Sequence, residues 1–213
     1  NDSNGRRDVF VRDTQGSTTI LVSAQAGGGS GSGSSFPTAI TPDGRYAAFS
    51  SDAPNLTVGT FVSLSQSNVY RWSASDTICT SLAYAVAAPP GPSSLNSRPG
   101  ISYDGRFVAF VNAALRGILV HDRVLRSLRL IPVAFYYDDL KCSLSSGSYA
   151  LVVCSNANQR ADVYDILPGA ILWGNSGGGG VRNPALSGDG QLVAFASGGV
   201  LAVFSLATGV TSV

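Results

Sequence analysis

The sequence contains no methionine and only one histidine, and only 13% of its residues are charged. A chain without methionine is not a complete translation product, so we expect a processed form or a fragment of a longer protein. The charged fraction is about half of what soluble proteins usually carry, and the formal net charge is +1. A near-neutral chain is not expected to bind nucleic acid, because the phosphate backbone requires a basic surface.

Long apolar runs and helical patterns are also missing. No run reaches about 18 apolar residues, so no membrane-spanning helix is predicted. The apolar positions alternate at a period of two instead of 3.6. The three cysteines leave at least one without an intrachain partner, and their spacings match no zinc motif. A Cys142–Cys154 disulfide across the hairpin around Gly147 would need a bulge, and buried thiols, Cys79 included, are the other interpretation.

One phrase recurs along the chain: an apolar strand, a turn centred on Asp-Gly, and a second strand of alternating apolar residues. Asp-Gly between two such runs predicts a hairpin, because glycine adopts positive φ without a Cβ clash. The aspartates are interpreted as structural, since their side chains accept backbone N–H bonds in such turns. The predicted turn residues are Asp43, Gly44, Asp104, Gly105, Asp189 and Gly190, with Gly147 alone in a degenerate copy.

A second hairpin follows each copy, as in Asp8-Val9-Phe10-Val11-Arg12-Asp13. A period in the low forties with four strands per period is typical of a β-propeller. We predict an all-β propeller domain over residues 1–213, with four-stranded antiparallel blades starting near residues 36, 97, 138 and 182. Residues 8–23 form one further strand pair before the first copy. This gives about five blades, four of them complete; we favour a fragment of a larger propeller, and closure as a ring of five blades is the alternative.

The stretches Thr41-Pro42-Asp43-Gly44-Arg45-Tyr46-Ala47-Ala48-Phe49 and Ser102-Tyr103-Asp104-Gly105-Arg106-Phe107-Val108-Ala109-Phe110 resemble the TolB-type propeller repeat. The resemblance covers most of the chain. It implies that the Asp-Gly hairpin supplies the inner two strands of each blade, which would make residues 8–23 the outer strand pair of a further blade. It also implies a bacterial protein in the periplasm or outside the cell. The copy around Gly147 departs from the repeat because it lacks the aspartate and the arginine.

Reactive residues do not converge in the sequence. His121 stands beside Asp122, but there is no Gly-x-Ser-x-Gly elbow for a nucleophilic serine. Two oxygen-rich loops, with Asp138 and Asp139 in one and Asp52 and Asn55 in the other, are candidate calcium sites, although calcium requires six to eight ligands. The alternative is that these loops are only solvated. The glycine tracts 27–33 and 177–180 are interpreted as flexible linkers with too little apolar content to pack.

Loops on a rigid scaffold are where recognition concentrates. The loops 52–66 and 83–97 are therefore candidate contact surfaces, with exposed aromatics as partner anchors. Arg116, Arg123, Arg126 and Arg129 are interpreted as a solvated strand edge. The candidate aromatic anchors are Phe61, Phe135, Tyr136 and Tyr137.

We therefore predict a non-catalytic extracytoplasmic propeller that binds protein and acts as a scaffold. It would serve as an extrinsic subunit of a larger envelope or membrane complex. One alternative is a carbohydrate-active or peptidase-associated propeller. A second alternative is a metal-stabilised structural repeat of a surface or filament protein.

Overall fold

The computed structural model describes residues 4–57, 68–75, 79–82, 99–112, 115–133, 143–144, 150–155, 160–175 and 181–213. These residues form eighteen strands. Within these ranges no helix has the length and apolar character needed to cross a membrane. The chain divides into two compact units, residues 1–95 and residues 96–213.

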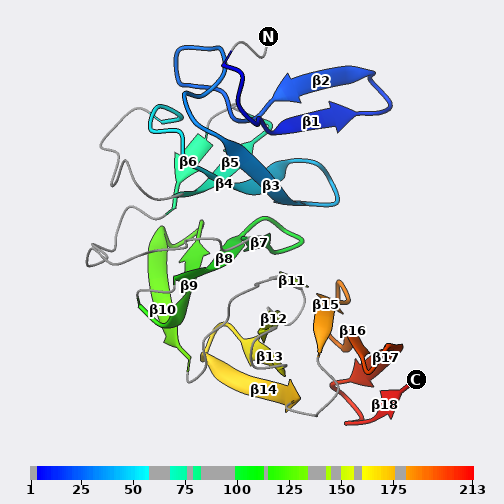
Figure 1. Cartoon of the computed structure of the whole chain (residues 1–213). Helices are drawn as coiled ribbons and strands as arrows, with labels where there is room; N and C mark the ends of the chain where they lie inside the picture. Colours follow the sequence, from blue (N-terminus) through cyan, green and yellow to red (C-terminus); the bar gives the residue numbers. More distant parts are fainter. Residues whose placement is uncertain are drawn as a thin grey trace. The chain divides into compact units, whose positions relative to one another are not determined.

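The first unit holds one two-stranded and one four-stranded antiparallel sheet, coloured blue to cyan in Figure 1. In the larger sheet each strand pairs with the next one along the chain, which is the order that two successive hairpins produce. The strands are β1 (Phe10–Asp13), β2 (Thr18–Leu21), β3 (Ser35–Ile40), β4 (Tyr46–Ser51), β5 (Asn68–Ser73) and β6 (Cys79–Ser81).

The second unit holds three four-stranded antiparallel sheets of the same order. The first is β7 (Gly100–Ile101), β8 (Phe107–Asn112), β9 (Gly117–Asp122) and β10 (Ser127–Pro132). The second is β11 (Ser143–Leu144), β12 (Ala150–Ser155), β13 (Arg160–Asp165) and β14 (Ala170–Asn175). The third is β15 (Arg182–Leu186), β16 (Leu192–Ser197), β17 (Val200–Ser205) and β18 (Thr211–Ser212). The all-β prediction and the four-stranded repeat are thus confirmed.

Alternation of side chains explains how the sheets of the second unit stack. In the middle sheet Leu151 opposes Tyr164, and Val152 opposes Val163. Leu151 and Tyr164 belong to the cluster shared with β8, β9 and β10, whereas Val152 and Val163 belong to the cluster shared with β16 and β17. Because successive residues of a strand point to opposite faces, one sheet fills two cores. This accounts for its nearly continuous apolar strands.

The first unit has its own core between the two-stranded sheet and the larger sheet. Val9 and Val22 from the strand pair pack with Phe49, Tyr70 and Trp72. The rings of Phe49 and Tyr70 stack with centroids 5.5 Å apart. Aromatic side chains of this size supply a large share of the buried apolar area of a core.

The part of the glycine tract nearest β3 is packed, so the interpretation of the tract as a flexible linker was wrong for Gly31 and Gly33. Gly31 N donates to Ser23 O at 3.0 Å, and Ser35 N donates to Arg7 O at 2.8 Å. A Cβ on Gly33 would lie 2.6 Å from Ala53 N and 2.7 Å from Asp52 C. The glycines therefore allow the backbone of this loop to lie against the chain that follows β4.

Candidate interaction surfaces at the sheet ends

The described Asp-Gly turns share one hydrogen-bond pattern. Asp43 Oδ1 accepts the Thr41 hydroxyl at 2.6 Å and Arg45 N–H at 3.0 Å. Thr41 Oγ1 in turn accepts Tyr46 N–H at 3.0 Å. Gly44 adopts φ +69°. The Thr41 hydroxyl, followed by the N–H and guanidinium of Arg45, lowers the pKa of Asp43 to about 2.

The turns at Asp104 and Asp189 repeat this arrangement. Ser102 and Ser187 take the place of Thr41, with hydroxyl-to-carboxylate distances of 2.6 and 2.5 Å. At the last turn, hydrogen bonds from the Ser187 hydroxyl and Gln191 N–H lower the pKa of Asp189. The residue two positions before each aspartate therefore carries a hydroxyl that stabilises the turn. This structural role was not predicted from the sequence. Its recurrence in these copies is the signal that would have found it.

A second repeated turn closes the outer hairpins whose turns the structure describes, those that follow β1, β9, β13 and β17. Asp13 Oδ1 accepts N–H bonds from Gln15 and Gly16 at 2.9 and 3.0 Å, and these bonds lower the pKa of Asp13. Asp122 and Asp165 act similarly toward the residues that follow them. The fourth residue after the acceptor has positive φ in each described case: Ser17, Arg126, Gly169 and Gly209.

Both repeated turns lie at the same end of a sheet, which we call the turn end. Backbone bonds join them directly: Ala74 N donates to Arg45 O at 2.8 Å, and Arg123 N donates to Arg106 O at 2.9 Å. In the sheet β7–β10 an ion pair adds to this bond, with Arg106 Nη2 2.8 Å from Asp122 Oδ2. Burial raises the pKa of Asp122, but hydrogen bonds from Arg106, Leu125 and Val124 outweigh it and lower the pKa overall.

Among the turn ends that the structure describes, the ion pair between Arg106 and Asp122 occurs in this sheet alone, because other residues stand at the two positions in the other copies. Where Asp122 ends β9, Ser73 ends β5, and Arg45 pairs with its own turn residue Asp43 at 2.5 Å. In the last sheet the corresponding residues are Gln191 and Ser205, which carry no charge. The frame of the turns is constant, whereas the charges at the turn ends vary from sheet to sheet.

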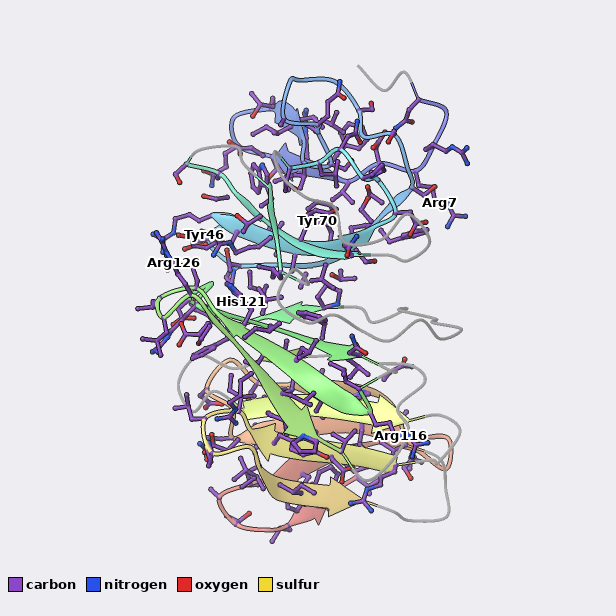
Figure 2. The ribbon with its side chains drawn as sticks, turned by 90° about the vertical axis from the view of Figure 1, so that its left-hand side faces the viewer. Arg7, Tyr46, Tyr70, Arg116, His121 and Arg126 are labelled. Atoms are coloured by element: carbon purple, nitrogen blue, oxygen red, sulfur yellow. The ribbon has the colours of Figure 1, made fainter. Side chains whose placement is uncertain are left out.

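The turn between β9 and β10 is unusual in its side chains. Val124 is 61% exposed and Leu125 is 69% exposed. Arg126 follows with φ +52°, a conformation that costs a non-glycine residue about 1 kcal/mol. Arg116 lies in the turn between β8 and β9, at the opposite end of the same sheet, as Figure 2 shows. The four arginines therefore do not form one edge. Arg123, Arg126 and Arg129 lie toward the turn end of the sheet, and Arg116 lies at the opposite end.

The other end of the first unit carries a packed pair of loops, residues 24–34 and 52–57. Asn55 connects them: its Oδ1 accepts Ser32 N–H at 2.8 Å and the Ser32 hydroxyl at 3.0 Å, while its Nδ2 donates to Gln25 Oε1 at 2.8 Å. Leu56 and Ala53 are buried. This part of the predicted contact loop 52–66 therefore has a structural role.

The candidate calcium ligands are only partly placed. Asn55 Oδ1 already accepts two hydrogen bonds, and Asp52 is exposed. No three His, Cys, Asp or Glu side chains gather within the ranges that the structure describes. Asp138 and Asp139 lie outside the described residues, so calcium binding by them stays a prediction.

Several other predicted residues also lie outside the described ranges. They are Phe61, Phe135, Tyr136, Tyr137, Gly147, Cys142 and the loop 83–97. His121 is described and lies in mid-strand, opposite Leu128 and Val108. It is half-buried. Both of these cross-strand partners are aliphatic, so neither of them could act as a nucleophile.

Comparison with known proteins places the fold. No protein-family model and no curated protein matches the sequence. Among solved structures, TolB from Acinetobacter baumannii is similar with a TM-score of 0.58 and 18% identity over 96% of this chain. The putative TolB from Agrobacterium tumefaciens is similar with a TM-score of 0.57 and 17% identity over 97% of this chain. The dihydro-heme d1 dehydrogenase NirN, in complex with DHE, is similar with a TM-score of 0.57 and 17% identity over the whole of this chain.

The fold is a TolB-like β-propeller built of four-stranded antiparallel sheets. At these identities the likeness concerns the fold alone. The chain spans 48% of the Acinetobacter TolB structure and 42% of NirN. Closure with five blades and membership of a larger ring both stay predictions.

Proposed function

We propose that this chain is a non-catalytic, extracytoplasmic propeller that acts as a protein-interaction scaffold, as an extrinsic subunit of an envelope or membrane complex. Propeller folds commonly mediate protein interactions. The observation that supports the proposal best is the contrast between constant turn frames and variable surface residues. A fixed frame that carries variable ends is how recognition scaffolds are built.

The chemistry of the turn ends supports the same proposal. The aspartates at 43, 104, 122 and 189 accept hydrogen bonds from their own turns. Carboxylates whose oxygens already accept hydrogen bonds from their own turns are poorly placed to exchange a proton with a substrate, as a general acid or base must. The extracytoplasmic location follows the resemblance to the TolB-type repeat, and the TolB structures support it only through the fold.

A cross-linking experiment tests the proposal. The tagged chain would be expressed in the envelope of a bacterial host carrying its genomic neighbours, cross-linked, and analysed by mass spectrometry. We expect one partner in fixed stoichiometry, and we expect removal of residues 85–95 to abolish its capture. A monomeric chain without a partner, combined with hydrolysis of an oligosaccharide or peptide panel, would favour the carbohydrate-active or peptidase-associated alternative.

A further inference from the structure

The turn of residues 123–126 carries side chains that its geometry does not require. Its frame needs an acceptor at Asp122, and the central residues contribute only their N–H groups, at 2.8 Å from Val124 and 3.2 Å from Leu125. The corresponding pairs in the other described outer turns are Gln15-Gly16, Leu167-Pro168 and Ala207-Thr208. Two adjacent large aliphatic side chains, both more than 60% exposed, are available for contact with an apolar phase.

Arginine occupies the turn against local preference. The residues that correspond to Arg126 are Ser17, Gly169 and Gly209, which tolerate positive φ with a smaller or absent side chain. Arg126 is exposed. Arg123 flanks the aliphatic pair on its other side and is anchored through Nε to Gly105 O at 3.4 Å.

Three carboxylates lie near this turn: Asp122 is buried, Asp165 is half-buried and Asp104 is exposed. Asp122 is held by Arg106 and by the turn's own N–H groups. Asp104 accepts the Ser102 hydroxyl and Arg106 N–H. Arg123, Arg126 and Arg129 outnumber the two carboxylates that reach the surface here, Asp104 and Asp165, so the net charge at this end of the sheets is positive.

The neighbouring sheet extends the same surface. Leu167, in the turn between β13 and β14, is 50% exposed. Its carbonyl accepts a hydrogen bond from Arg129 of β10, which connects the turn ends of the two sheets. We call the set Val124, Leu125, Leu167, Arg123, Arg126 and Arg129 the tip surface.

We propose that the tip surface binds a membrane surface that contains anionic lipid. The aliphatic side chains would enter the interfacial region while the guanidinium groups bind lipid phosphates. A stable protein interface buries about 800 Å² on each partner. The tip surface offers only a few exposed aliphatic side chains with cations beside them, and such a set suffices for reversible binding to a bilayer.

Vesicle co-sedimentation of the 1–213 chain tests this inference. The probes are vesicles of phosphatidylcholine alone and of phosphatidylcholine mixed with phosphatidylglycerol. We expect the wild-type chain to partition about tenfold more strongly onto the anionic vesicles. The double variant Val124→Ser, Leu125→Ser should lose about tenfold of that binding. Arg126→Asn, which suits positive φ, should lose about fivefold, and added salt should reduce wild-type binding.

A matched control lies at the start of β17, directly after the turn that joins it to β16. Val200 and Leu201 are 50% and 68% exposed, and they are preceded by two glycines instead of an arginine. The variant Val200→Ser, Leu201→Ser should bind anionic vesicles as the wild type does. Thermal melting of every variant confirms that it is folded.

Three results would overturn the proposal. One is equal partition of the wild-type chain onto both vesicle types, and another is an equal loss in the control variant. The third is an absence of vesicle binding together with tip-dependent binding to a poly-glutamate peptide, which would assign the surface to an acidic protein segment. The protein-interaction proposal does not depend on any of these outcomes.

Discussion

The packed glycine loop of the first unit makes a sharp prediction about stability. A Cβ on Gly33 would lie 2.6 Å from Ala53 N, 2.7 Å from Asp52 C and 2.9 Å from Ala53 Cα. All three are backbone atoms, so no side-chain rotation can relieve the overlap. Gly33→Ala therefore forces the loop away from the chain after β4 and disturbs Ala53, which is fully buried.

The size of the effect follows from two opposing terms. Overpacking a well-packed site costs about 1–3 kcal/mol, and replacing glycine by alanine recovers about 0.4–1 kcal/mol from the unfolded chain. We expect a net loss of about 1–2 kcal/mol. At Gly27, in the same tract, an added Cβ meets nothing within 4 Å. Gly27→Ala should therefore leave stability unchanged or raise it by about 0.5 kcal/mol.

Tryptophan fluorescence during urea unfolding measures both variants. Trp72 lies in the core cluster that contains Ala53 and Leu56. Trp173 packs against the second unit's cluster, so a Trp173→Phe background restricts the signal to the first unit. If Gly33→Ala and Gly27→Ala unfold at the same urea concentration, the loop is not packed in solution and the reasoning is refuted.

Three further predictions concern the second unit. The pKa of Asp122 is lowered in the folded chain, so its contribution is present above the unfolded pKa of about 4 and disappears as pH falls through the folded value. Asp122→Asn should lower the free energy of unfolding by about 2 kcal/mol at neutral pH. The free energy from urea unfolding should then fall less steeply with decreasing pH in the variant, and an equal slope in variant and wild type contradicts this. The Phe195 side chain is 2% exposed, so Phe195→Ala should lower the free energy of unfolding by about 3–4 kcal/mol, measured by Trp173 fluorescence during urea unfolding. A loss under about 1 kcal/mol would place the ring outside the core. Arg126→Gly should stabilise by about 1 kcal/mol in thermal melting, whereas destabilisation would show that the arginine has a structural partner.

The strands could be predicted from the sequence because their signals are local. The strands β3, β7, β11 and β15 begin at residues 35, 100, 143 and 182, close to the starts expected at 36, 97, 138 and 182. Period-two alternation and an Asp-Gly turn each involve only a few neighbouring residues. The two faces of a strand such as β12 follow from the same alternation.

Features that depend on distant partners could not be predicted in this way. The tract around Gly33 reads as a linker because its partner, Ala53, is twenty residues away. Composition alone cannot distinguish glycine chosen for freedom from glycine chosen for close approach. The separation of Arg116 from Arg126 is a different case, since it follows from the antiparallel pairing of β9 with β8 and β10, which places successive turns at opposite ends of the sheet.

The self-contained turns also bear on how such a chain could change over evolution. The Asp-Gly turns satisfy their polar groups within six residues, and within each sheet every strand pairs with its sequence neighbour. A duplicated or deleted copy would therefore bring its own hydrogen bonds and need only an apolar face to lie against. A propeller of this kind can gain or lose whole modules by recombination without redesign of the remaining ones.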